Sequence, residues 1–270
     1  MPAGVRVSPS ASERPATWPG ILASFPKEST ASRLTAASPR ATRHARPRGA
    51  ACYPEPGPGP RRNRTKRSKP IRTAALAGAL GPPLFAVLLT TLTALQYDFM
   101  VGIGWEPLGD PAAAWPSGLA LGRHGWAMDL GFLASGILLA VFALGLDHAT
   151  PRGPKTGPAL LLLSGAAMAL LAFETDPISR TGPRSWHGLV HDAAFVVFAL
   201  ALLLALLAFG LRMRRAPAWR RHARYTLATA AVCAACLFLP GVAYYGFLAA
   251  ALVWIEATAL KVLARGRPTG

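Results

Sequence analysis

Two histidines lie four residues apart in the stretch FETDPISRTGPRSWHGLVHD, which covers residues 173–192. This spacing places His187 and His191 on the same face of a helix, with His191 about 6 Å further along it. Such a pair is suited to binding one metal ion. A carboxylate such as Asp129 or Asp176 would complete a three-ligand site with an open position for water. A histidine beside a carboxylate is equally suited to general acid–base chemistry.

Three interpretations of these residues stay open at the level of sequence. The first is a metal or acid–base site formed by Asp176, His187 and His191. The second is an ionisable binding or proton-relay site, to which Asp129 and Asp192 would add carboxylates. The third is structural, because a neutral histidine satisfies backbone partners at a helix start, where an acid is also favoured by the helix dipole. Haem is disfavoured, since two histidines on one helix cannot ligate opposite faces of one haem. The sequence therefore names neither a metal nor a cofactor.

Two further polar features lie inside long apolar runs. Glu256 in WIEATALK is a candidate binding residue, because an acid within a membrane helix is costly unless it is paired or protonated. The structural alternative is a hydrogen bond within the bundle or an ion pair with Lys261. Cys233 and Cys236 form a C-x-x-C pattern among alanine and leucine. We interpret them as small buried side chains rather than as a redox or metal site.

The composition of the chain is typical of a membrane protein. Of 270 residues, 52% are hydrophobic and 15% are charged, which is outside the ordinary range of soluble proteins. Residues 1–72 are rich in proline, arginine, serine, alanine and glycine, whereas long apolar runs recur from Ala74 onward. We therefore expect a disordered tail over 1–72 and a membrane domain over 73–264, followed by a short cytoplasmic tail over 265–270.

Six apolar runs are candidates for crossing roughly 30 Å of hydrocarbon, which takes about 20 helical residues. They cover residues 74–96, 126–147, 157–173, 187–211, 225–240 and 243–263. The third and fifth runs are short, and Pro240 with Gly241 separates the fifth from the sixth. Small residues at Gly131, Ser135 and Gly165 predict close packing of the second and third helices. The predicted fold class is an all-α integral membrane protein, a six-transmembrane-helix bundle.

The distribution of lysine and arginine predicts the orientation of this bundle, because these residues concentrate on the cytoplasmic side of membranes. With the N-terminus inside, all 29 of them except Arg123, Arg180 and Arg184 fall at the cytoplasmic ends. Aromatic residues that favour the membrane interface fall at the opposite ends: Tyr97, Trp105, Trp115, Trp126, Trp186, Tyr244 and Tyr245. We expect a protein of the cytoplasmic membrane with both termini in the cytoplasm.

The end of the tail, RRNRTKRSKPIR, is strongly basic. Beside a bilayer it would attract anionic lipid head groups, at roughly 1 kcal/mol per basic residue. The alternatives are that it only fixes orientation, that translation starts further downstream and much of the tail is not made, or that the arginine-rich, acid-poor tail is a transit peptide. The tail lacks the pattern of a cleaved secretory signal. We expect membrane lipids as partners and no nucleic acid, and the sequence identifies no protein partner.

Three short elements occur at the ends of the predicted helices. They are Trp115, Ser117, Leu119 and Gly122 before the second run, Phe173, Asp176 and Pro177 after the third, and His187, Gly188 and His191 at the start of the fourth. In these elements the chain resembles the bacterial and archaeal membrane family called domain of unknown function 998, over roughly residues 74–264. It departs from the family pattern at Gly118, where an aspartate is common, and at Glu174, where a proline is common. The family name assigns no activity, so the resemblance implies a fold and no reaction.

The leading hypothesis from sequence is a membrane protein that binds or modifies a lipid or cell-envelope component at the outer leaflet. Asp176, His187 and His191 would form its polar centre, with Asp129 as the nearest supporting acid. The second hypothesis is a small transporter or proton-coupled permease, in which Glu256 and the histidine pair mark the ends of a polar route. The third is a non-catalytic membrane assembly subunit. Whether the protein is an enzyme is not decided by the sequence.

Overall fold

A computed structural model describes residues 64–111, 115–177, 181–239 and 241–265 of the chain. Within these residues the regular elements are helices, and no β-strand is present. The all-α prediction is confirmed for this part of the chain. The predictions for residues 1–63, which include most of the basic tail, and for residues 266–270 lie outside it.

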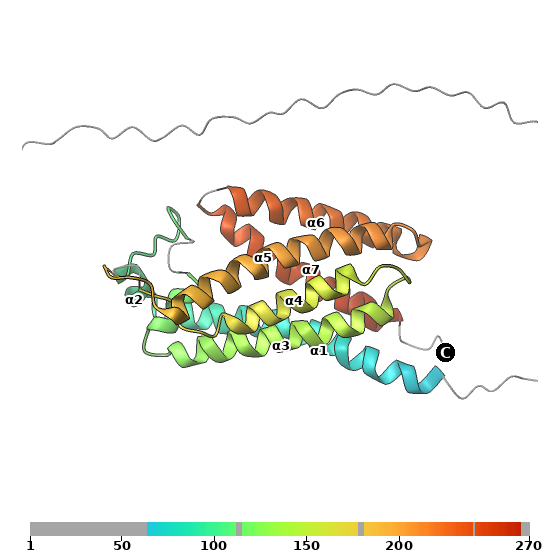
Figure 1. Cartoon of the computed structure of the whole chain (residues 1–270), viewed down its shortest axis with the longest axis horizontal. Helices are drawn as coiled ribbons and strands as arrows, with labels where there is room; N and C mark the ends of the chain where they lie inside the picture. Colours follow the sequence, from blue (N-terminus) through green and yellow to red (C-terminus); the bar gives the residue numbers. More distant parts are fainter. Residues whose placement is uncertain (1–63, 112–114, 178–180, 240, 266–270) are drawn as a thin grey trace, which may run out of the picture. The chain divides into compact units, whose positions relative to one another are not determined.

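Six long helices make up the described part of the membrane domain (Figure 1). They are α1 (Arg64–Leu95), α3 (Gly125–Ala149), α4 (Thr156–Leu170), α5 (Trp186–Met213), α6 (Arg220–Phe238) and α7 (Ala243–Arg265). Short helices occupy the connections: α2 (Tyr97–Gly102) and the 3-10 helices η2 (Ser117–Leu121) and η3 (Pro217–Trp219). Each predicted run corresponds to one long helix, and α1 starts inside the segment that we assigned to the tail.

The division between α6 and α7 falls where the sequence predicts it. Helix α6 ends at Phe238 and α7 begins at Ala243. Gly241 between them has a φ of 68°, a left-handed conformation that glycine adopts without a steric penalty. The long apolar sequence is thereby folded into two antiparallel helices instead of one.

The six long helices form a closed ring. Helix α1 packs against α3, α3 against α4, α4 against α5, α5 against α6 and α6 against α7, and α7 returns to contact α1. Consecutive long helices run in opposite directions along a common axis (Figure 1). Alternate connections therefore gather at the same end of the bundle.

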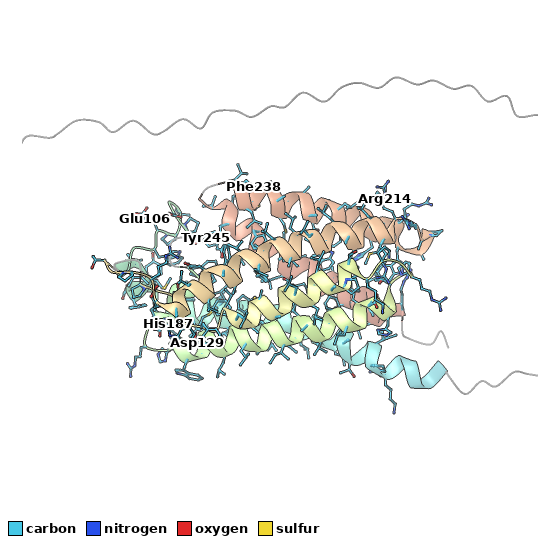
Figure 2. All side chains as sticks on the ribbon, in the orientation of Figure 1. Glu106, Asp129, His187, Arg214, Phe238 and Tyr245 are labelled. Carbon is cyan, nitrogen blue, oxygen red and sulfur yellow. The ribbon has the colours of Figure 1, made fainter. Side chains whose placement is uncertain are left out.

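The two ends of the bundle differ in chemistry, and we name them by their residues. The aromatic end carries Tyr97, Trp105, Trp115, Tyr244 and Tyr245, and the basic end carries Arg214, Arg215, Arg220, Arg221 and Arg224. Figure 2 shows Tyr245 and His187 near one end and Arg214 at the other. At the aromatic end, the ring of Trp115 stacks against Trp105 with a centroid distance of 6.3 Å and meets Tyr245 edge-on at 5.1 Å. These contacts hold the α2–η2 connection against the start of α7.

Glycines determine how closely α3 approaches its neighbours. A Cβ atom on Gly136 would lie 2.6 Å from the carbonyl oxygen of Gly165, and one on Gly165 would lie 2.8 Å from the amide nitrogen of Ala140. The predicted close packing of the second and third helices is therefore present, at Gly136 and Gly165. Gly131 differs from the prediction, since it faces the side chain of Leu88 on α1.

Outward-facing apolar side chains show that the bundle is built for a membrane. On α3 the exposed residues follow one helical face: Leu130, Leu133, Ile137, Val141 and Leu144. On α5 a similar face carries Leu189, Val196, Leu200, Leu204, Leu207 and Leu211. Soluble proteins rarely expose continuous apolar surfaces of this kind, whereas lipid-facing helices require them.

Four helices are long and apolar enough to cross a bilayer in the described residues, and the remaining two long helices are not. The four segments are Lys69–Leu95, Gly125–Ala149, Trp186–Met213 and Ala243–Arg265. Helix α4 is apolar but has 15 residues. The apolar part of α6, from Tyr225 to Phe238, is about 21 Å long at 1.5 Å per residue, which is less than the roughly 30 Å of a hydrocarbon core. The prediction of a helical membrane bundle thus holds, and its count of six crossings stays a prediction.

One buried arginine fastens the basic end. Arg212 on α5 donates from Nη1 to Oδ1 of Asp147 at 2.9 Å and from Nε to the carbonyl oxygen of Pro151. It also donates to the carbonyl oxygens of Asp147 and Pro154 at 3.3 and 3.4 Å. The guanidinium therefore ties the α3–α4 connection to the end of α5. From the sequence alone, Arg212 contributed only to the predicted orientation of the bundle in the membrane.

Candidate functional site

Three segments far apart in the sequence meet at the aromatic end. Ser117 begins η2, Phe173 follows the end of α4, and His191 lies in the second turn of α5. Helix α5 starts at Trp186 because Ser185 caps it, its hydroxyl oxygen accepting a hydrogen bond from the amide of Gly188 at 3.0 Å. This start directs His191 inward, and its side chain is only 4% exposed.

Both ring nitrogens of His191 have a hydrogen-bond partner. Nδ1 lies 2.7 Å from the carbonyl oxygen of Phe173, and Nε2 lies 2.9 Å from Oγ of Ser117. Because a carbonyl oxygen only accepts, Nδ1 carries a proton, and in the neutral imidazole Nε2 then accepts from the Ser117 hydroxyl. The ring of Phe132 packs edge-on against the imidazole at a centroid distance of 6.3 Å. The orientation of His191 is thereby fixed.

His187 has a different environment from His191. Its Nδ1 lies 2.9 Å from the carbonyl oxygen of Glu174 and 3.0 Å from Oγ of Ser185. Asp176 accepts a hydrogen bond from the amide of Ser185 at 2.8 Å. His187 and Asp176 therefore both fasten the α4–α5 connection, which is the structural role that the sequence left open for a histidine at a helix start.

A polar pocket of about 400 Å³ opens at the aromatic end beside His191. Its charged and polar walls include Asp176, Arg184 and Asp192, and Arg184 forms an ion pair with Asp192. Ser117 and His191 lie on the same walls. The pocket thus presents charges of both signs next to a serine–histidine pair.

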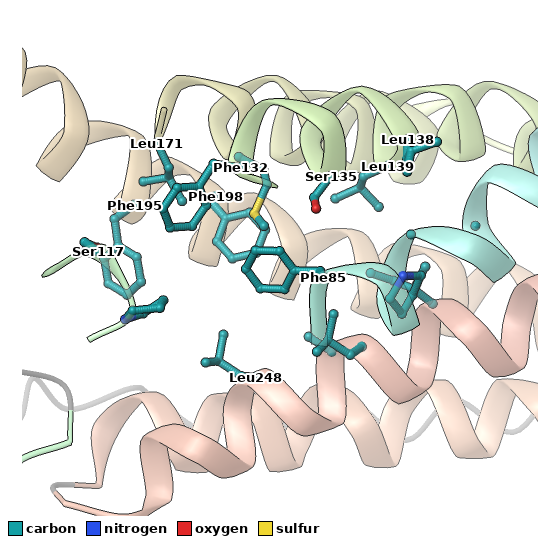
Figure 3. Close-up of a pocket in the computed structure, with 18 of the residues that line it drawn as sticks. Phe85, Ser117, Phe132, Ser135, Leu138, Leu139, Leu171, Phe195, Phe198 and Leu248 are labelled. Atoms are coloured by element: carbon teal, nitrogen blue, oxygen red, sulfur yellow. The ribbon is translucent and has the colours of Figure 1, made fainter. Parts of the chain in front are cut away.

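An apolar cavity of about 70 Å³ lies between the long helices, and Figure 3 shows residues that line it. Most of its walls are aliphatic or aromatic, such as Phe85, Phe132, Phe198 and Leu248. Three residues line both spaces: Ser117, Phe195 and Tyr244. The polar pocket and the apolar cavity therefore adjoin at Ser117.

Asp129 and Glu256 are not brought together with these residues. Asp129 has one buried carboxylate oxygen with no hydrogen-bond partner among the described residues, and it lines neither space. Glu256 also lines neither of them, and the expected partner Lys261 places its ammonium 5.3 Å from the centre of the Trp219 ring. The transporter hypothesis expects a polar route through the bundle, and the cavity between the helices is instead apolar.

The metal hypothesis has no geometric support in the described part of the chain. No three histidine, cysteine, aspartate or glutamate side chains lie there in a group able to hold one metal ion. Cys233 is buried and Cys236 is half-buried, and both are free thiols. His187 and His191 share a helix face but bind different backbone carbonyls, so their spacing does not produce a shared ligand.

A model of a protein family of unknown function, DUF998, matches residues 79–266 of the chain. The chain belongs to this family. Comparison with curated proteins and with solved structures gave no match. In this DUF998 member the three elements that carry the resemblance converge on His191, which belongs to the third element. Its imidazole is hydrogen-bonded to the hydroxyl of Ser117 in the first element and to the carbonyl oxygen of Phe173 in the second. The protein is therefore a membrane protein whose family elements meet at one pocket.

Sequence reasoning missed Ser117, Arg184 and Tyr244 as residues of this pocket. Ser117 belongs to the first family element, and this was the one available signal for it. Its distance of 74 residues from His191 gave no indication of contact. Arg184 was counted only as an exception to the charge distribution, and Tyr244 only as an interfacial aromatic residue.

Proposed function

We propose that this protein binds an amphipathic lipid or envelope molecule at the aromatic end of its bundle. The head group lies in the polar pocket, and the first part of the acyl chain lies in the apolar cavity. The observation that carries this proposal is that the two spaces adjoin and share Ser117, Phe195 and Tyr244 as walls. A head group with both a phosphate and an ammonium matches Arg184 and Asp192 in charge.

The size of the cavity limits how much of the ligand it accepts. Its volume of about 70 Å³ is below the roughly 150 Å³ of an engineered cavity that binds benzene. It accommodates only the carbons nearest the head group, and the remaining chain stays in the bilayer. This arrangement suits a ligand taken from the membrane rather than from water.

The proposed orientation follows from charge. The aromatic end faces the outside of the cytoplasmic membrane, and the basic end, with both chain termini, faces the cytoplasm. In this orientation three of the 29 lysines and arginines of the chain lie outside, namely Arg123, Arg180 and Arg184. Six crossings are proposed, with α4 and the apolar part of α6 sheltered by longer neighbouring helices. The basic tail then lies beside the anionic inner leaflet.

The test is native mass spectrometry of the purified protein with added phosphatidylethanolamine. Ala251→Phe fills the apolar cavity, because Ala251 lines it and is 4% exposed. Ala249→Phe adds the same ring to an exposed position on the same helix and is the control. Retained lipid in the wild type and the control, with at least a tenfold loss in Ala251→Phe, supports the proposal. Equal lipid retention in both folded variants contradicts it.

A further inference from the structure

Ser117 and His191 have the arrangement of a nucleophile and its general base. The Ser117 hydroxyl is 2.9 Å from Nε2 of His191, and Nδ1 of the same ring is 2.7 Å from the carbonyl oxygen of Phe173. A serine hydroxyl is a weak nucleophile unless an adjacent base removes its proton, and the base is usually oriented by a third group. Here the carbonyl oxygen of Phe173 is that third group.

We propose that Ser117 and His191 catalyse acyl transfer from an ester of the bound amphipathic molecule. This inference rests on the proposed function and names a reaction for the same site. It needs no metal, and its co-reactant is water or a second alcohol.

The position of Ser117 matches the position of an ester in a lipid. In an acyl lipid the ester carbonyl joins the polar head group to the apolar chain. Ser117 lies where the polar pocket and the apolar cavity meet, and it lines both. A ligand bound as proposed would therefore present its ester carbonyl to the Ser117 hydroxyl.

The reaction proceeds in two balanced steps. Oγ of Ser117 attacks the ester carbonyl carbon while its proton passes to Nε2 of His191. The bond from the carbonyl carbon to the alcohol oxygen breaks, and His191 returns the proton to that oxygen, which leaves an acyl ester on Ser117. Water then attacks this ester, His191 accepts and returns one proton, and the carboxylic acid leaves. The net change is ester plus water to acid plus alcohol.

The same hydrogen bonds could serve only to fasten η2 to α5, and reactivity distinguishes the two roles. A hydroxyl that is merely held does not react with a fluorophosphonate probe, whereas an activated serine forms a covalent adduct that is detected by intact mass and peptide mapping. We expect labelling of wild-type protein at Ser117 and none in Ser117→Ala. His191→Gln should label about 10²- to 10⁴-fold more slowly, which is the usual contribution of a general base.

Two variants act as controls for this experiment. Thr90→Ala removes a hydroxyl from an exposed position that lines neither space and should label at the wild-type rate. His187→Gln removes the neighbouring histidine, which hydrogen-bonds to the α4–α5 connection and lines neither space, and should also label normally. Equal labelling of wild type and Ser117→Ala, or no labelling of a folded wild type, overturns the proposal.

A cysteine variant covers the case in which Ser117→Ala fails to fold. Ser117→Cys places a thiol beside Nε2 of His191, and iodoacetamide should alkylate this thiol rapidly near pH 7. The rate of alkylation should fall when His191→Gln is added. If the dependence of the alkylation rate on pH is unchanged by His191→Gln, the role of His191 as a base is contradicted. Lipid retention is measured in parallel. Retained phosphatidylethanolamine without probe labelling contradicts catalysis by Ser117 and His191 but not the proposed lipid binding. Labelling without lipid retention contradicts the proposed ligand but not the nucleophilic role of Ser117.

Discussion

Ser117 and His191 are joined by a hydrogen bond of 2.9 Å although 74 residues separate them in the sequence. The bond connects the 3-10 helix η2 to the long helix α5 at the point where a polar pocket meets an apolar cavity. It therefore contributes to the fold of the aromatic end whether or not it also takes part in a reaction. Its structural contribution is measurable on its own.

A double-mutant cycle measures the energetic coupling of these two residues. Ser117→Ala and His191→Gln should each lower the free energy of unfolding by about 1–3 kcal/mol, because each leaves a partly buried polar group without its hydrogen-bond partner. The double variant should be less destabilised than the sum by about 1 kcal/mol. Thermal unfolding in detergent gives these values. Ser135→Ala combined with His191→Gln is the control and should be additive.

Removing Arg212 should destabilise the basic end. Arg212→Ala leaves Asp147 without its cation and the carbonyl oxygens of Pro151 and Pro154 without a donor. Because loss of one partner of a buried ion pair costs about 3–5 kcal/mol, we expect a loss of this order in the free energy of unfolding. Arg214→Ala, two residues away and exposed, should change it by less than about 0.5 kcal/mol. A similar effect of both variants would contradict the role of Arg212.

Enlarging Gly136 should separate α3 from α4. In Gly136→Ala the new methyl group would meet the backbone of Gly165 and Ala169, and backbone cannot rotate away as a side chain can. Overpacking of this kind costs about 1–3 kcal/mol of the free energy of unfolding. Gly102→Ala is the matched control, since its methyl group would have no atom within 4 Å. A loss of thermal stability confined to Gly136→Ala is the expected result.

Acid should weaken the contact between α6 and α7 through His222. Burial, followed by the charges of Lys261 and Arg265, lowers the pKa of His222 to about 4. In the unfolded chain a histidine has a pKa of about 6.5, so between pH 6.5 and 4 the unfolded state binds a proton that the folded state does not. Stability therefore falls as the pH drops through this window and changes no further below it.

The His222 effect can be isolated by substitution. His222 accepts from or donates to the hydroxyl of Thr258 through Nε2 at 3.0 Å, and glutamine retains a polar group at this position. His222→Gln should have a flatter profile of melting temperature against pH between 6.5 and 4 than wild type. His148→Gln, at an exposed site, should keep the wild-type profile. An unchanged slope in His222→Gln would show that another group is responsible.

The proposed orientation predicts which end reacts from outside the cell. Single cysteines are introduced after Cys52, Cys233 and Cys236 have been replaced by alanine. Gly182→Cys, in the connection at the aromatic end, should react with a membrane-impermeant maleimide in intact cells. Arg215→Cys, at the basic end, should react only after the cells are opened. The reverse pattern would invert the topology and place the polar pocket in the cytoplasm.

Much of the architecture was predictable because lipid imposes a simple requirement on sequence. A segment that crosses hydrocarbon must be apolar and must satisfy its own backbone, so the helices and the α6–α7 break at Gly241 could be predicted from the apolar runs. The start of α1 at Arg64 was not predicted, since helix can continue from the membrane into a basic segment. Close packing of α3 and α4 was predicted, but which glycine faces which helix depends on rotation about the helix axis.

The candidate site was predicted only in part, because its residues belong to segments that are brought together by folding. The sequence determined that the protein is an all-helical membrane protein and that an element with His187 and His191 opens one helix. The tertiary structure decided that His191 turns inward to Ser117 and Phe173 while His187 fastens a connection. Helix periodicity places two residues on one face, but the neighbours of each depend on the closure of a six-helix ring. That closure, and not the spacing of the histidines, creates the pocket.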